Sequence, residues 1–149
     1  MMQTKRCNRL DDFLMKKMLN SEKNYFSDEE RYQAYRNFLR LTTKEGKRIA
    51  ATQTIKKWFG IGGIKRPNRE GLFKIGFDLR LSVKEMEELF VYVMREPGFQ
   101  VNDYREMIFL YGFYHQITYD DCINMIDYLE KSLPGNLSIR QHNCTNDIW

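Results

Sequence analysis

The sequence is poor in the residues that cross-link or interrupt a fold, with three cysteines and three prolines among 149 residues. Cys7, Cys122 and Cys144 lie far apart and cannot all pair, which favours reduced thiols in a reducing compartment over a disulfide framework. No apolar run approaches the roughly 20 residues that cross a membrane. Residues 1–6 lead into charged residues with no signal-peptide core. We therefore predict a cytoplasmic protein without a membrane partner.

Residues that could build a catalytic or metal centre are equally sparse. His115 follows a hydrophobic run at an expected helix end, a place typical of packing or capping, and His142 with Cys144 forms only an isolated pair. The remaining cysteines do not supply the ligand spacing of a zinc site. The glycine-rich residues 60–63 lack the preceding strand and the following Lys-Ser/Thr of a phosphate-binding loop. These absences predict a protein that is not an enzyme and that uses no cofactor and no metal.

Hydrophobic and aromatic residues are plentiful, at 42% and 14%, which is enough for a sizeable core. The net charge of +4 is divided unevenly along the chain. Residues 44–74 carry nine Lys or Arg against two acidic residues, a net charge of +7, and residues 75–130 carry four against eleven, a net charge of −7. The basic stretch is suited to phosphates or to an acidic protein surface, and its alternative interpretation is a solvated face.

Helical periodicity accounts for most of the chain. Residues 9–20 form one amphipathic segment, and Ser27-Asp28-Glu29-Glu30 has the form of a capping box for a second, with Tyr32, Tyr35, Phe38, Leu39 and Leu41 expected on its buried side. Thr42–Glu45 offers another helix start, so residues 43–59 are either one helix or two. A short helix over residues 52–59 would turn Ile55, Trp58 and Phe59 inward, and Pro67 would break the chain after the glycine-rich loop.

The second half contains an internal repeat with an offset of 36 residues. Arg69-Glu70 aligns with Arg105-Glu106, Gly76-Phe77 with Gly112-Phe113, and Leu89-Phe90 with Met125-Ile126. Asn68 and Ser82 are expected to cap the two helices of the first copy. Each copy therefore predicts a helix hairpin that needs its neighbour to bury its apolar face, with the paired glycines allowing close approach.

These patterns together predict an all-α fold, a helical bundle with a helix-turn-helix-like centre and stacked helix hairpins. Residues 1–66 would supply the N-terminal helices and the basic segment. Residues 67–133 would supply the two hairpins of the same compact domain, and residues 134–149 a polar tail.

Three stretches resemble the phage-repressor (Xre/Cro-type) helix-turn-helix proteins. They are Thr52-Gln53-Thr54-Ile55-Lys56-Lys57-Trp58, then Gly63-Ile64-Lys65-Arg66-Pro67-Asn68-Arg69, and then residues 72–85, Leu-Phe-Lys-Ile-Gly-Phe-Asp-Leu-Arg-Leu-Ser-Val-Lys-Glu. A subset of such proteins from Firmicutes is similar in adding a second helical pair, as residues 103–130 do. The resemblance covers about half of the chain. One departure is that the usual glycine-containing turn before the recognition helix is missing, since Gly46 lies several residues too early.

The resemblance implies that residues 52–59 enter the major groove of duplex DNA. Gln53, Thr54, Lys56 and Lys57 would then lie at or near base edges and backbone. Lys65 and Arg66, with Lys47 and Arg48, would bind phosphates, which sets affinity and its salt dependence without reading sequence.

Two functions follow from these observations. The first is a non-enzymatic DNA-binding regulator of transcription. The second is a protein-binding adaptor or inhibitor from a mobile element that acts on a nucleic-acid-processing complex, with either the acidic hairpins or the basic stretch as its docking surface. A homodimer is compatible with both, and the sequence names neither the DNA site nor the protein partner.

Overall fold

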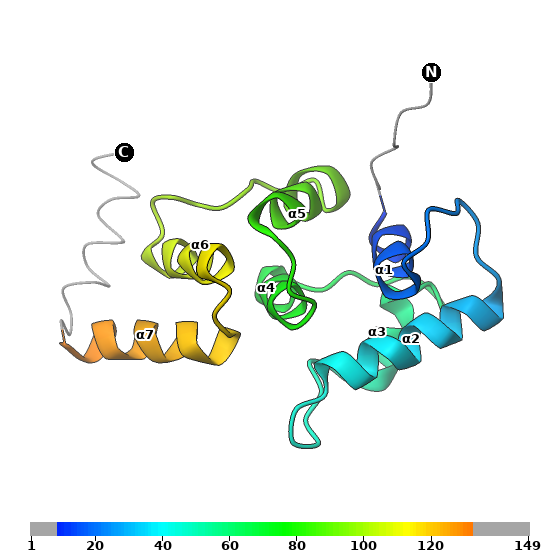
Figure 1. Cartoon of the computed structure of the whole chain (residues 1–149), viewed down its shortest axis with the longest axis horizontal. Helices are drawn as coiled ribbons and strands as arrows, with labels where there is room; N and C mark the ends of the chain where they lie inside the picture. The colour runs from blue at the N-terminus through cyan, green and yellow to red at the C-terminus, as the bar shows by residue number, and fades with distance from the viewer. Residues whose placement is uncertain (1–8, 133–149) are drawn as a thin grey trace.

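Residues 9–132, the part of the chain that the computed structural model describes, contain seven α-helices and one π-helical segment (Figure 1). They are α1 (Leu10–Leu19), α2 (Asp28–Thr42), α3 (Thr52–Trp58), α4 (Arg69–Asp78), α5 (Val83–Glu88), the π-helix η1 (Leu89–Val93), α6 (Tyr104–His115) and α7 (Tyr119–Ser132). No strand occurs among the described residues, which confirms the predicted all-α helical bundle. The predicted tail, residues 134–149, lies outside them. None of the described helices is long and apolar enough to cross a membrane.

The helix starts follow from the predicted caps. Ser27 and Ser82 each accept a hydrogen bond from the backbone N–H of the glutamate three residues on, and that glutamate accepts one from the serine N–H, so both capping boxes are formed. The Asn68 side chain accepts from the Gly71 N–H at 2.8 Å and begins α4. Local sequence therefore fixes where α2, α4 and α5 begin.

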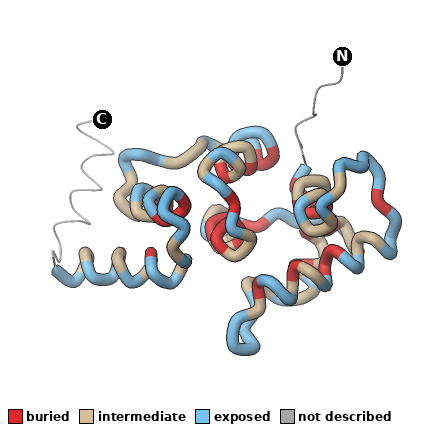
Figure 2. The backbone as a smooth tube through the Cα atoms, in the orientation of Figure 1, coloured by how far each residue is buried: buried red, intermediate tan, exposed pale blue. Residues whose placement is uncertain are grey.

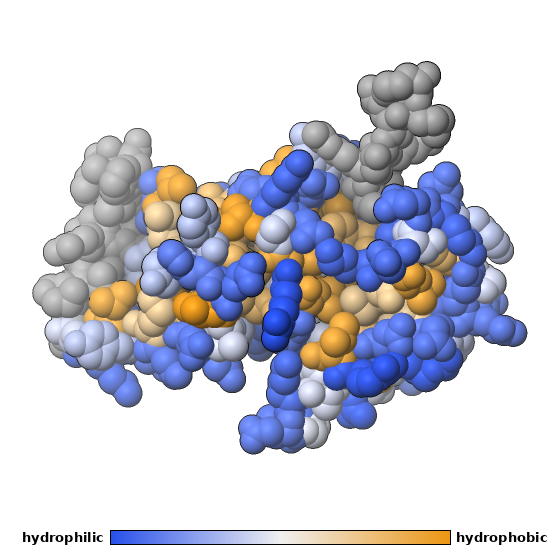
Figure 3. Space-filling model, in the orientation of Figure 1, coloured by the Kyte–Doolittle hydropathy of each residue, from blue (hydrophilic) through white to orange (hydrophobic). Residues whose placement is uncertain are grey.

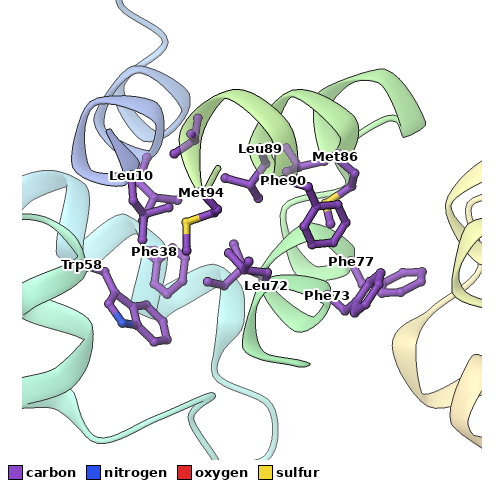
Figure 4. Close-up of a cluster of buried hydrophobic side chains, with 14 of the residues drawn as sticks. Leu10, Phe38, Trp58, Leu72, Phe73, Phe77, Met86, Leu89, Phe90 and Met94 are labelled. Carbon is purple, nitrogen blue, oxygen red and sulfur yellow. The ribbon is translucent and has the colours of Figure 1, made fainter. Parts of the chain in front are cut away.

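The helices lie in three groups along the longest axis of the molecule, with α1–α3 at one end, α4, α5 and η1 in the middle, and α6 with α7 at the other end (Figure 1). The buried residues follow the middle group most closely (Figure 2). One apolar cluster runs from Leu10 to Ile126. In it Leu10 and Phe38 from the first group meet Leu72, Leu89 and Met94 from the second (Figure 4). The N-terminal helices and the first hairpin therefore share one core.

The buried side of α2 differs in part from the predicted one. Tyr35 and Phe38 are buried as expected, but Tyr32 and Leu41 are 41% and 49% exposed. The stripe that faces the core consists of residues 34, 35, 38 and 42, which recur at helical spacing. Leu41 lies one position outside that stripe, so the prediction from its apolar side chain that it is buried was wrong.

The predicted helix start at Thr42–Glu45 is wrong. Residue Thr42 ends α2, where its hydroxyl donates to the Phe38 carbonyl at 2.8 Å. Lys44 and Lys47 then exchange two backbone hydrogen bonds of 2.8 Å around Glu45 and Gly46, which both have positive φ (51° and 77°). Two positive φ values at the centre of such a turn characterise the tight turn of β-hairpins. Residues 43–59 therefore contain a turn followed by the short helix α3. They form neither a single helix over the whole range nor two helices.

The 36-residue repeat is real in three dimensions. Arg80 and Gln116, which occupy equivalent positions, both adopt left-handed backbone geometry (φ 56° and 58°) after the first helix of each hairpin. The residues that follow them donate to the carbonyls of Gly76 and Gly112 at 2.9 and 3.1 Å. Equivalent residues thus form the same corner in both copies.

The two hairpins pack face to face rather than as successive layers of a stack. Phe73 stacks on its own equivalent Phe109 at 4.5 Å, and Phe77 on its equivalent Phe113 at 3.9 Å between ring centroids. The cross contacts are reciprocal, since α4 contacts α7 and α5 contacts α6. Reciprocal contacts and self-paired equivalents are the signature of a two-fold relation. The two predicted hairpins are therefore related by an approximate two-fold rotation.

The second helix of the first hairpin changes its winding at Leu89. The Met94 N–H donates to the Leu89 carbonyl at 2.9 Å, five residues back, so η1 is π-helical where a continuous α-helix was expected. The wider turn buries Leu89, Phe90, Val93 and Met94 at the same time. This short segment consequently contacts α1 of the N-terminal group as well as α4 and α5 of its own group.

Candidate nucleic-acid interface

The core-facing residues of α3 hold it firmly. Ile55, Trp58 and Phe59 are buried, as the sequence predicts. Phe38 of α2 packs edge-on against Trp58 and Phe59, at 6.1 and 5.3 Å between ring centroids. Large buried aromatic pairs of this kind dominate local packing energy. The helix is short but has a defined orientation on α2.

The end of α3 is fixed by an ionic link across three helices. Arg31 of α2 donates to the Phe59 carbonyl at 2.9 Å and to the Asp11 carboxylate of α1 at 3.2 Å. Gly60 has a φ of +76°, and a Cβ there would lie 2.8 Å from the Arg31 guanidinium. Glycine is therefore required where the chain leaves α3, both for the backbone and for the arginine that stabilises the helix end.

The outward side of α3 carries the residues predicted to contact DNA. Gln53 is exposed and Lys57, one turn later, is partly exposed on the face opposite Ile55. Thr54 lies at the edge of that face and is partly exposed. Lys56 lies on the other edge, where its ammonium is 5.9 and 5.7 Å from the ring centroids of Tyr32 and Tyr35 on α2. Of the four predicted residues, Gln53 and Lys57 are thus the ones that lie furthest from the core.

The turn between α2 and α3 presents a second set of basic side chains. Lys44, Lys47 and Arg48 are exposed. The turn projects from the lower edge of the molecule (Figure 1), where the surface is hydrophilic (Figure 3). Lys44 also lies close enough to Asp78 at the end of α4 to favour its ionised form. Burial is the larger effect, so the pKa of Asp78 is raised to about 6.

The loop after α3 separates the two remaining predicted residues. Lys65 is exposed. Arg66 instead directs its guanidinium at the end of η1, where Nη2 donates to the Met94 carbonyl at 2.7 Å. Cations at a helix C-terminus satisfy free carbonyls and interact favourably with the dipole. Arg66 therefore has a structural role that the resemblance did not imply.

Sequence reasoning missed two contributors to this surface. Lys44 was not among the predicted contacts because the turn around Glu45-Gly46 lacks the Asn-Gly or Asp-Gly signature of a hairpin turn. Arg31 was missed because its role depends on Phe59 and Asp11, which are distant in sequence. The high positive charge of residues 44–74 could have indicated Lys44. No local sequence pattern indicated the role of Arg31.

The connection before α3 differs from a helix-turn-helix. Nine residues, 43–51, separate α2 from α3, whereas a helix-turn-helix joins its helices by about three or four. Whichever ligand it binds, α3 is therefore presented on a longer, turn-containing connection. Among the described residues, no group of three His, Cys, Asp or Glu side chains is placed to hold a metal ion.

Comparison with known proteins gives no independent assignment of this surface. No protein-family model, no curated protein and no solved structure matches the chain.

Proposed function

We propose that this chain binds duplex DNA through α3 and the basic segments on either side of it, and that it acts as a non-enzymatic DNA-binding regulator. The observation that supports this most directly is the two-sided nature of α3. Ile55 and Trp58 anchor the helix in the core, while Gln53 and Lys57 share the opposite face. A helix held in this way can enter a major groove without disturbing the core behind it.

The flanking segments supply the charge that such binding needs. Lys47, Arg48 and Lys65 are exposed and lie before and after α3 in the sequence. Lysine and arginine side chains on phosphates provide a large share of the affinity for DNA and make it depend on salt. In this proposal Gln53 and Lys57 read base edges, because glutamine pairs with adenine and lysine with guanine. Thr54 and Lys56 contact the backbone at the rim of the groove, and Arg66 supports the loop that carries Lys65.

A salt series on random duplex DNA tests the proposal. Anisotropy of a labelled duplex of about 24 base pairs, measured from about 50 to 200 mM salt, should give a linear loss of log affinity with log salt. Arg48→Glu should weaken binding at least about tenfold and reduce the salt slope by about 1, because a phosphate contact is lost. Lys57→Glu should also weaken binding at least about tenfold, because it places a negative charge in the groove. The matched control is Lys84→Glu, which makes the same charge change at an exposed position of α5.

Two results would overturn the proposal. One is the absence of binding by the unmodified chain at the lowest salt. The other is an equal loss of affinity in Lys84→Glu and Lys57→Glu, because net charge alone would then explain binding. Circular dichroism of each variant establishes that the fold is retained.

A further inference from the structure

The first hairpin has one face that is completely covered. Four apolar residues of α4 and η1 on that face are at most 4% exposed: Leu72, Ile75, Leu89 and Val93. The N-terminal helices provide the cover, since α2 contacts α4 and α1 contacts η1. In Figure 4, Leu89 and Leu72 lie against Leu10 and Phe38 from those helices.

The repeat places four apolar residues of the second hairpin at the equivalent positions, and we call them the outer face: Ile108, Tyr111, Met125 and Leu129. Tyr111 is 49% exposed where its equivalent Ile75 is fully buried, and Met125 is only partly buried where its equivalent Leu89 is fully buried. Figure 1 places α6 and α7 at the end of the molecule away from α1–α3. Ile108 packs against the core, and Tyr111, Met125 and Leu129 keep the apolar character of the covered face without the same cover.

Helix α1, which covers the first hairpin, also forms an ion pair beside the apolar contact. Lys17 of α1 forms an ion pair with Glu85 at the start of α5. The repeat equivalent of Glu85 is Asp121, which is exposed at the start of α7. Helix α7 carries four acidic residues and one lysine, a net charge of −3. The edge of the outer face is therefore complementary to a basic residue in the position that Lys17 occupies on α1.

We propose that the outer face binds an amphipathic helix of a partner protein. The partner helix would place large aliphatic side chains on Tyr111, Met125 and Leu129, as α1 buries Leu14 and Met15, and a lysine against Asp121. This surface is separate from α3, so the inference does not depend on DNA binding. It gives the chain two distinct contact regions, one basic near α3 and one apolar with an acidic edge at the far end.

The chain's own N-terminal helices provide a probe of this chemistry. A fluorescein-labelled peptide of residues 9–42, which contains α1 and α2, is titrated with the full chain and followed by anisotropy. Leu129→Asp should weaken binding at least tenfold, and Val101→Asp, at a loop residue that is 68% exposed, should leave it unchanged. Asp121→Lys should also weaken binding, and a peptide carrying Lys17→Glu should restore it on that variant.

The charge exchange keeps the test decisive if Leu129→Asp does not fold, since Asp121 is exposed. It also separates the outer face from exchange of the peptide into the first hairpin, which would depend on Glu85. The proposal is overturned if the peptide does not bind or if the Lys17→Glu peptide fails to restore binding to Asp121→Lys. It is also overturned if sedimentation shows a dimer of the chain that Leu129→Asp dissociates. Binding only to a chain that ends at Ser132 would assign the outer face to residues 133–149 and would overturn it as well.

Discussion

Replacing Gly112 by alanine tests the close approach between the two helices of the second hairpin. A Cβ at Gly112 would lie 2.3 Å from the Cys122 sulfur and 3.0 Å from the Phe77 ring. Neither neighbour can move easily, because Cys122 is fully buried on a short side chain and Phe77 is stacked on Phe113. Overpacking of this kind costs about 1–3 kcal/mol, and the gain in helix propensity returns about 1 kcal/mol. A contact as short as 2.3 Å places the overpacking cost in the upper part of that range. We therefore expect Gly112→Ala to lower the free energy of unfolding by about 1–2 kcal/mol.

The repeat supplies the comparison. A Cβ at Gly76 would lie 3.0 Å from the Phe113 ring, the same distance as from a Cβ at Gly112 to Phe77. Its shortest contact, 2.2 Å, is with the sulfur of Met86, which is fully buried but has a longer and more flexible side chain than Cys122 and can adopt another rotamer. Gly76→Ala should therefore change the free energy of unfolding by less than about 1 kcal/mol, although Gly76 and Gly112 are equivalent in the repeat. Urea unfolding followed by circular dichroism measures both variants.

A double-mutant cycle identifies the cause of the loss. Cys122→Ala removes the sulfur that the new methyl group would meet, so it should recover about 1–2 kcal/mol in the Gly112→Ala background. The reasoning fails if Gly112→Ala is as stable as the unmodified chain. It also fails if the effects of Gly112→Ala and Cys122→Ala simply add.

Substitutions at two further positions, Asp78 and Arg69, test charged groups at the two ends of α4. The folded-state pKa of Asp78, about 6 against an ordinary 3.8, means that the folded chain binds more protons between these values, so stability should fall as pH rises through that range and stay low above it. Asp78 is partly exposed, so we discount its pKa shift for solvent screening and expect Asp78→Asn to raise the free energy of unfolding by about 1–2 kcal/mol at pH 7 but not at pH 4. Equal effects at both pH values would contradict this. Arg69 donates to the buried Glu106 at 2.6 and 2.9 Å and to the Gly98 carbonyl at 2.6 Å, so Arg69→Ala should cost about 3–5 kcal/mol in a urea titration. Arg69→Lys should recover only part of that loss, and full recovery would show that the fork of hydrogen bonds is unimportant.

The features that the sequence predicted correctly are local or literally repeated. Ser27, Asn68 and Ser82 cap helices through hydrogen bonds that span three residues, so composition and spacing suffice to find them. The hairpins were found because equivalent residues recur at a constant offset. Their face-to-face arrangement was not, because one sequence offset is compatible with either a translation or a two-fold rotation.

The features that were missed depend on residues far apart in the chain. Lys56 leans over Tyr32 and Tyr35, and Arg66 reaches the Met94 carbonyl 28 residues away. A charge pattern does not distinguish a lysine over aromatic rings from one in solvent. A separate helix at α3 was one of the two alternatives that the sequence left open, and what α3 binds stays a prediction.

The two-fold arrangement of the hairpins limits how this architecture can grow. Repeats related by translation leave a free end that accepts another copy, and such arrays lengthen through tandem duplication. Here the matching surfaces of α4 and α6 are already joined through Phe73 and Phe109. A third hairpin of the same kind could not use this surface, because it is already occupied. The two hairpins therefore form a closed pair, and a larger protein would have to add a different kind of element.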